Sequence, residues 1–152
     1  MKTLRLLALL SAVLGALASA CSRGGDPVRE TLDAVVKAAN ARDAKGLFAR
    51  VAPGFQGADG SGFADARATV ERYFAAYEIL NVSFRDVRIE RAEGAARVRL
   101  RAELSGQPRR IGGLEGLVPS SSAYDFDLRL TREGDDWKIA WAQWNPAGSP
   151  GP

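Results

Sequence analysis

The sequence has no histidine and a single cysteine among its 152 residues. One cysteine cannot form an internal disulfide, and without histidine it leaves no ordinary zinc ligand set. A histidine general base, a Ser-His-Asp triad and a Cys-His dyad are excluded as well. We therefore expect no metal site and no cofactor, and we can name no catalytic residue; a non-catalytic protein is favoured, while an enzyme that uses a carboxylate stays open.

The N-terminus has the pattern of a secretory signal. Lys2 and Arg5 precede an apolar run at 6–17, which is too short to span a bilayer as a helix, and small residues follow at 18–20. The next residue is Cys21, and the stretch LASAC at 17–21 resembles a bacterial lipobox. The resemblance implies acylation of Cys21, cleavage before it, and a signal peptide at 1–20.

A lipid-anchored protein of the bacterial cell envelope is therefore expected, with residues 21–26 as acylated cysteine and linker. Because Ser22 rather than aspartate follows the cysteine, what is known of lipoprotein sorting favours the periplasmic face of the outer membrane in a cell with two membranes. The alternatives are an ordinary signal peptide with an unmodified cysteine, or an uncleaved apolar segment. Loss of Lys2 and Arg5 would lower the formal charge of +3 by two, so nucleic acid is not an expected partner.

The remaining chain reads as one domain at 27–145 with a disordered Pro/Gly/Ser-rich tail at 146–152. Apolar residues at helical spacing predict helices at about 27–41 and 63–80, and Asp43 can cap a short helix between them. The glycines and prolines of 53–62 predict a loop, with a vestigial strand as the alternative.

From residue 82 onward the apolar period changes to two, which predicts four antiparallel strands. The apolar residues Val82 and Phe84 occupy even-numbered positions, whereas Val87 and Ile89 occupy odd-numbered ones. One extra residue between the two pairs would keep all four on the same face, so a β-bulge is expected at 85–86. The fold class is α+β, with three N-terminal helices packed on one face of the sheet.

The order of these elements resembles the nuclear-transport-factor-two-like (NTF2-like) superfamily, the cone fold shared with ketosteroid isomerases and polyketide cyclases. The segments that carry the resemblance are ANARD at 39–43, YFAAY at 73–77 and DLRLTREGDDWKI at 127–139. The resemblance implies a curved, cystatin-like sheet of about four to six strands around the helices, with a cavity between them. In the enzymes an aspartate or histidine acts in this cavity beside tyrosines. Asp125 and Asp127 alternate with apolar residues and are expected to face solvent, so no catalytic role is transferred.

The expected cavity lining comes from the third helix and the inner faces of the strands. Its residues are Tyr73, Tyr77, Phe84, Leu100, Phe126, Leu128, Trp137 and Trp141. Trp137 and Trp141 are four residues apart in the last strand, so they are expected on the same face, whereas Trp144 is expected on the opposite face. The alternative interpretation of these aromatic residues is ordinary core packing.

Two further segments have two interpretations each. The arginines at 97, 99 and 101 share a strand face that could contact anionic lipid or an acidic partner, or could pair with Glu90, Glu103, Asp125 and Asp127. The connection 105–122 is long for a compact domain and is predicted to be a lid or partner-docking loop, or to fold back on the sheet. Its candidate contact residues are Arg109, Arg110, Ile111, Leu114 and Leu117.

Three functional hypotheses remain. The first is a non-catalytic domain that binds a small apolar ligand or an envelope protein. The second is an isomerase- or cyclase-like enzyme, which would need a cavity carboxylate with a raised pKa. The third is a scaffold that forms a homodimer through its outer sheet face.

Overall fold

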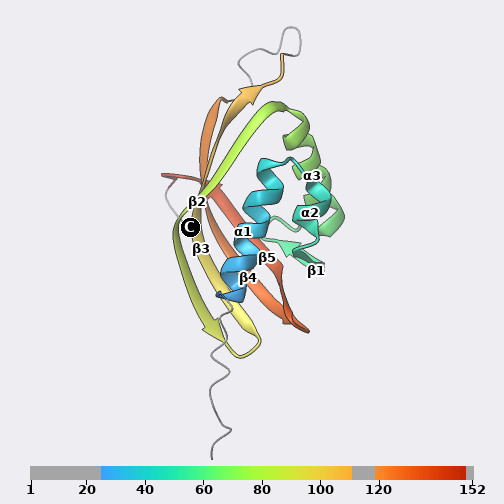
Figure 1. Ribbon diagram of the computed structural model, residues 1–152, viewed down its shortest axis with the longest axis vertical. Helices are drawn as coiled ribbons and strands as arrows, with labels where there is room; N and C mark the ends of the chain where they lie inside the picture. The colour runs from blue at the N-terminus through green and yellow to red at the C-terminus, as the bar shows by residue number, and fades with distance from the viewer. Residues whose placement is uncertain (1–24, 111–118, 150–152) are drawn as a thin grey trace, which may run out of the picture.

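The computed structural model describes residues 25–110 and 119–149, in which three helices pack against one five-stranded sheet (Figure 1). The predictions for Cys21, Ile111, Leu114 and Leu117 concern positions outside these residues. No described helix has both the length and the apolar composition to cross a membrane. The elements in chain order are α1 (Pro27–Asn40), α2 (Ala44–Phe48), β1 (Val51–Gly57), α3 (Phe63–Ala75), β2 (Tyr77–Ala92), β3 (Ala95–Pro108), β4 (Ser121–Glu133) and β5 (Asp136–Pro146).

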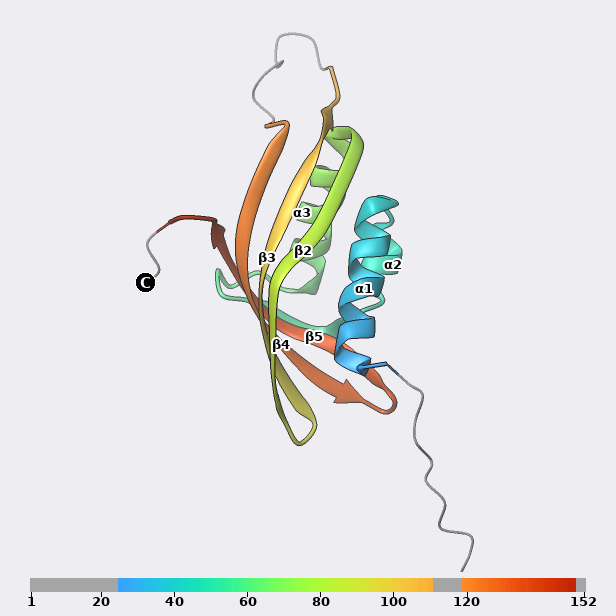
Figure 2. The ribbon, with the colours of Figure 1, turned by 60° about the vertical axis from the view of Figure 1, so that its left-hand side comes forward.

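The sheet has the strand order β1-β5-β4-β3-β2, with β1 parallel to β5 and the other pairs antiparallel. Its strands are long and curved, and the helices lie on one side of it (Figure 2). The predicted α+β fold with N-terminal helices on a curved sheet is thereby confirmed. The core lies between the helices and the inner sheet face, where Leu32, Val98 and Leu130 are almost fully buried.

Helix α1 begins where the sequence predicts. The Asp26 carboxylate accepts a hydrogen bond from the Val28 amide, and Pro27 occupies the first turn, where its missing N–H costs nothing. The helix buries one face, and the Thr31 hydroxyl lies 3.2 Å from the carbonyl oxygen of Trp137 on β5. The same hydroxyl lies 3.1 Å from the Pro27 carbonyl oxygen, so its proton is shared between the two, and the contact with Trp137 links the first helix to the last strand.

The alternating pattern of the strands predicts their faces correctly for most of the sheet. Val98, Leu100 and Ala102 of β3 are buried, and the arginines between them point to the other face. The expected bulge in β2 is confirmed, since the register with β3 shifts between Arg85 and Arg88 and Asp86 has a φ of 51°.

The structure corrects several boundaries. The predicted loop at 53–62 overlaps β1, a full strand rather than a vestigial one, which pairs with β5 although Pro53 and Gly54 interrupt its apolar pattern. Helix α3 ends at Ala75, and the chain enters β2 at Tyr77. The predicted loop at 105–122 is shorter, because β3 runs to Pro108 and β4 starts at Ser121. In each case backbone pairing with a neighbouring strand outweighs a weak local signal.

The prediction that Trp137 and Trp141 share a face was wrong. Arg129 pairs with Trp141 and Leu130 pairs with Ile139, so Ala140 is an extra residue in β5. This bulge reverses the alternation of every side chain that follows it. Trp141 therefore lies on the outer face over Arg129, and Trp144 lies opposite Phe126 on the inner face.

Candidate functional site

The inner face of the sheet and the helices enclose a cavity of about 440 Å³. Side chains from α1, α2, α3 and all five strands line it, and nearly all of them are apolar. We call this space the hydrophobic cavity. Its lining residues are Val35, Ala39, Leu47, Phe48, Val51, Phe55, Ala66, Thr69, Val70, Tyr73, Phe74, Val82, Phe84, Leu100, Ala102, Leu104, Tyr124, Phe126, Leu128, Ile139, Ala142 and Trp144.

No aspartate, glutamate, lysine or arginine of the described residues lines the hydrophobic cavity. Its only titratable lining side chains in this part of the chain are the phenols of Tyr73 and Tyr124. The volume falls in the range of small-molecule sites, which are mostly apolar with a few polar groups that orient the ligand. The site can therefore hold an uncharged molecule and offer it hydroxyl contacts.

Tyrosine hydroxyls form a short hydrogen-bonded chain beside the cavity. The Tyr77 hydroxyl donates to the carbonyl oxygen of Pro119 over 2.8 Å, and the Tyr73 hydroxyl lies 3.2 Å from that of Tyr77. The Tyr73 hydroxyl also lies 3.4 Å from the Ser122 hydroxyl. Burial, reinforced by the hydrogen bond with Tyr73, raises the pKa of Tyr77 well above its usual range. Tyr77 therefore stays protonated at any physiological pH.

Two of the lining residues are exposed to solvent, one on α3 and one on β5. Thr69 is exposed on α3, and Trp144 is 38% exposed on β5. The Trp144 ring stacks on Phe126 with 6.2 Å between ring centroids. The floor of the cavity is formed instead by buried residues such as Leu100, Leu128 and Ile139.

The structure brings five of the eight expected lining residues to the cavity wall, namely Tyr73, Phe84, Leu100, Phe126 and Leu128. Tyr77 lies behind Tyr73, with only 2% of its surface exposed. Trp137 packs against the core away from the cavity, and Trp141 is on the outer face. Sequence reasoning missed Trp144 because no local signal marks the bulge at Ala140.

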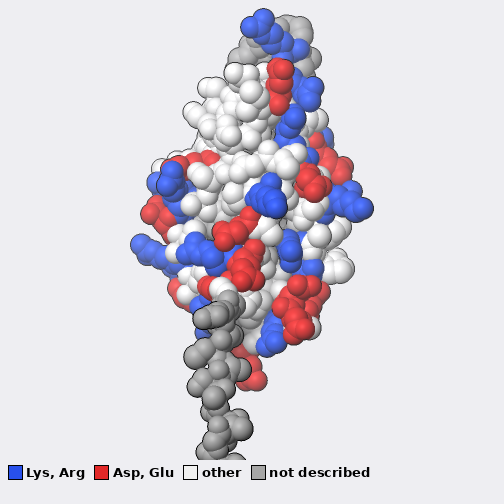
Figure 3. All heavy atoms as spheres, in the orientation of Figure 1, with Lys and Arg blue, Asp and Glu red and all other residues white. Residues whose placement is uncertain are grey.

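The outer sheet face carries a ladder of cross-strand ion pairs, which confirms the pairing interpretation of the arginine run. Arg97 pairs with Asp127, Arg101 with Asp125, Arg99 with Glu90 and Arg85 with Glu103. In the view of Figure 3, charges of both signs are interspersed over the middle and lower part of the surface. Asp125 and Asp127 thus face away from the cavity, as the strand alternation predicts.

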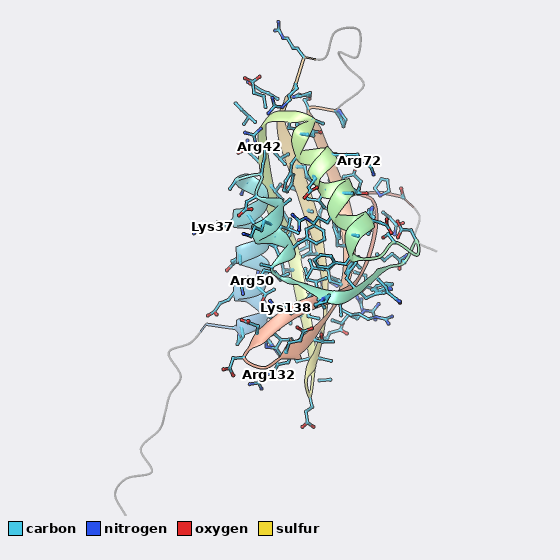
Figure 4. The ribbon with its side chains drawn as sticks, turned by 90° about the vertical axis from the view of Figure 1, so that its right-hand side faces the viewer. Lys37, Arg42, Arg50, Arg72, Arg132 and Lys138 are labelled. Carbon is cyan, nitrogen blue, oxygen red and sulfur yellow. The ribbon has the colours of Figure 1, made fainter. Side chains whose placement is uncertain are left out.

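The other cations of the helix side also stay outside the cavity. Figure 4 labels six of them, from Arg42 near one end of the molecule to Arg132 near the other, and none lines the cavity. Arg42 has a φ of 54°, and its guanidinium donates to the carbonyl oxygen of Tyr77 over 2.7 Å. Arg42 and Arg109 border a shallow surface hollow at that end. Within 25–110 and 119–149, no cluster of acidic, cysteine or histidine side chains could hold a metal ion.

The chain matches no protein-family model and no curated protein, so its class rests on the fold. A candidate scytalone dehydratase from Novosphingobium aromaticivorans superposes with a TM-score of 0.69 at 11% identity, over 80% of this chain and 82% of that one. A candidate dehydratase of the NTF2-like family from Streptomyces avermitilis gives a TM-score of 0.67 at 15% identity, over 81% and 95%.

A protein of unknown function with a cystatin-like fold from Nostoc punctiforme gives a TM-score of 0.62 at 11% identity, over 81% of this chain and 90% of that one. The described domain therefore has the NTF2-like, cystatin-like fold, as the sequence resemblance predicts. Identities this low establish the fold alone, and the activity has to be argued from the cavity.

Proposed function

We propose that this protein binds a small, uncharged, largely apolar molecule in the hydrophobic cavity and is held in the cell envelope by a lipid on Cys21. The observation that carries the binding proposal is the cavity itself, about 440 Å³ with an almost wholly apolar wall. Burial of apolar ligand surface against that wall would contribute about 25 cal/mol per Å². An ionised ligand would lose its hydration there without gaining a counter-charge from the described wall.

The position of the carboxylates supports binding rather than acid–base catalysis. An isomerase- or cyclase-like mechanism needs a base within hydrogen-bond reach of the substrate. Asp125 and Asp127 instead pair with arginines on the outer face. That ladder of charged pairs also makes the outer face a poor apolar dimer interface. We therefore do not propose a homodimer through this face.

Native mass spectrometry tests the binding proposal. The protein is incubated with an extract of its own cell envelope, and a discrete added mass is expected that collisional activation removes. Ala102→Leu would fill part of the cavity and reduce the bound fraction, whereas Ala64→Leu, at an exposed position of α3 outside the lining, would leave it unchanged. A bare protein mass under all conditions would contradict the proposal.

The anchor proposal is supported by the lipobox-like stretch 17–21 and by its place in the chain. Helix α1 begins at Pro27, six positions after Cys21, so an acylated Cys21 would hold the domain within about 20 Å of the lipid surface. Two acyl chains would provide stable attachment where one would be marginal.

Fractionation of Cys21→Ala tests the anchor. The variant is expected in the non-membrane fraction and without the mass of the lipid, while Ser22→Ala remains with the membranes. Recovery of Cys21→Ala in the membrane fraction would refute the anchor. Ser22→Asp should move the protein toward the inner membrane if the outer-membrane expectation is correct.

A further inference from the structure

The hydrogen-bonded chain of tyrosines has a fixed direction. A phenol carries one proton, and a carbonyl oxygen can only accept. Because the Tyr77 hydroxyl donates to the Pro119 carbonyl, it has no proton left for Tyr73. Tyr73 is therefore the donor in its hydrogen bond with Tyr77.

The same reasoning shows whether the Tyr73 hydroxyl can donate or accept a hydrogen bond in the cavity. Its proton is directed to Tyr77, so the 3.4 Å contact with Ser122 requires the serine hydroxyl to donate. The Tyr73 oxygen can then only accept further hydrogen bonds. The raised pKa of Tyr77 keeps this direction unchanged over the physiological pH range.

Tyr124 is the second phenol in the cavity wall. Ser122 and Tyr124 are two residues apart on β4, so their side chains leave the same face of the strand. Ser122 contacts the Tyr73 hydroxyl, and Tyr124 lies one step further along the strand in the cavity wall. A phenol at this position can both donate and accept.

We propose that the ligand is a neutral alcohol, bound with its hydroxyl between Tyr73 and Tyr124 and its apolar body over the buried floor of the cavity. This inference rests on the proposed ligand-binding function. The alcohol donates to the Tyr73 oxygen, which accepts a second hydrogen bond beside the one from Ser122, and it accepts from Tyr124. A ketone of the same skeleton could use only Tyr124, because it has no proton to give to Tyr73. A carboxylate would enter without a counter-charge from the described wall.

Calorimetric titration of the full-length protein with 2-decanol, 2-decanone and decanoate tests the inference. The probes share a linear C10 chain and differ mainly in their polar end. One additional hydrogen bond contributes about 1 kcal/mol net, so 2-decanol should bind about five-fold more tightly than 2-decanone. Decanoate should bind most weakly of the three.

Three conservative variants distinguish the acceptor role of Tyr73 from a general effect on packing. Tyr73→Phe should reduce the preference for the alcohol to less than about two-fold while the ketone affinity stays unchanged. Tyr124→Phe should weaken both probes alike and leave their ratio intact. Tyr77→Phe frees the Tyr73 proton for the ligand and should raise the affinity for the ketone relative to the alcohol.

The outcomes separate the two proposals. If none of the probes binds, the proposed ligand-binding function fails. If they bind but the ketone equals or exceeds the alcohol in the unmodified protein, only the inference about the alcohol is overturned. An alcohol preference that survives in Tyr73→Phe would overturn it as well.

Discussion

The side-chain amide of Asn40 forms two hydrogen bonds with the backbone of Val82. Its Nδ2 donates to the Val82 carbonyl oxygen over 3.1 Å, and its Oδ1 accepts from the Val82 amide over 2.6 Å. Asn40 is the last residue of α1, and Val82 lies on the edge strand β2. The side chain thus takes the place that a neighbouring strand would take, and it holds α1 against the edge of the sheet.

Asn40→Ala should lower the free energy of unfolding by about 1–2 kcal/mol, because both hydrogen bonds are lost. Asn40→Asp keeps an acceptor for the Val82 amide but places a carboxylate oxygen against the Val82 carbonyl oxygen, so it should recover little of that loss. Urea denaturation measures both. Asp33→Ala, on an exposed position of the same helix, is the control and should change stability by less than about 0.5 kcal/mol.

Gly106 lies where β3 passes close to β2. A Cβ atom at this position would come within 2.0 Å of the Ile79 carbonyl oxygen, which belongs to the backbone and has little freedom to move. Gly106→Ala should therefore destabilise the protein by about 2 kcal/mol, a typical penalty for a substitution that forces a backbone shift. Gly54→Ala on β1 meets no atom within 4 Å and should be neutral or slightly stabilising in the same thermal melts.

The ion pair between Arg97 and Asp127 should make stability depend on pH in the acid range. The hydrogen bond from Arg97 lowers the pKa of Asp127 below its ordinary value of 3.8. Since the folded-state pKa is the lower one, the stabilisation is complete above the unfolded-state pKa and is lost as the pH falls through the folded-state pKa. The pair is partly exposed, so its contribution should be below about 1 kcal/mol.

Asp127→Asn is the corresponding experiment. The stability difference from the unmodified protein should be constant above about pH 5 and should shrink as the pH falls below about 4. In an Arg97→Ala background the same substitution should show little pH dependence. A difference that persists unchanged at pH 2, or that is equally large without Arg97, would refute the assignment.

Trp144 should report ligand binding through its fluorescence, because it is the one tryptophan among the lining residues. Bound ligand near its ring should shift or quench the emission in the unmodified protein and in Trp141→Phe. The change should be lost in Trp144→Phe. If Trp144→Phe retains the full change while calorimetry shows unaltered binding, the ligand is not in this cavity.

Much of the fold could be predicted because hydrophobic periodicity records burial directly. The alternation along 98–104 identifies the inner face of β3, and the change of phase at 85–86 identifies the bulge in β2. The position of Asp125 and Asp127 on the outer face follows from the same alternation. In each of these cases the pattern in the sequence is itself the consequence of one face being buried.

The missed features depend on contacts between segments that are far apart in the chain. Strand β1 forms because β5 offers a parallel partner, although Pro53 and Gly54 weaken its own signal. The bulge at Ala140 appears only in the register with β4, and it decides whether Trp141 or Trp144 reaches the cavity. Tyr73 could be assigned to the wall from its helix face, whereas the direction of its hydrogen bond depends on the distant Pro119.

The bulge at Asp86 also affects whether two molecules of this protein can pair through the edges of their sheets. Strand β2 spans 16 residues at the edge of the sheet, and a long, regular edge invites pairing with the same edge of another molecule. The left-handed turn at Asp86 breaks that edge near its middle, and Asn40 and Arg42 engage backbone groups in its first half. A second chain thus finds no continuous row of donors and acceptors to join. The protein should therefore resist intermolecular β-sheet aggregation even at the high local concentrations that the proposed lipid anchor would produce.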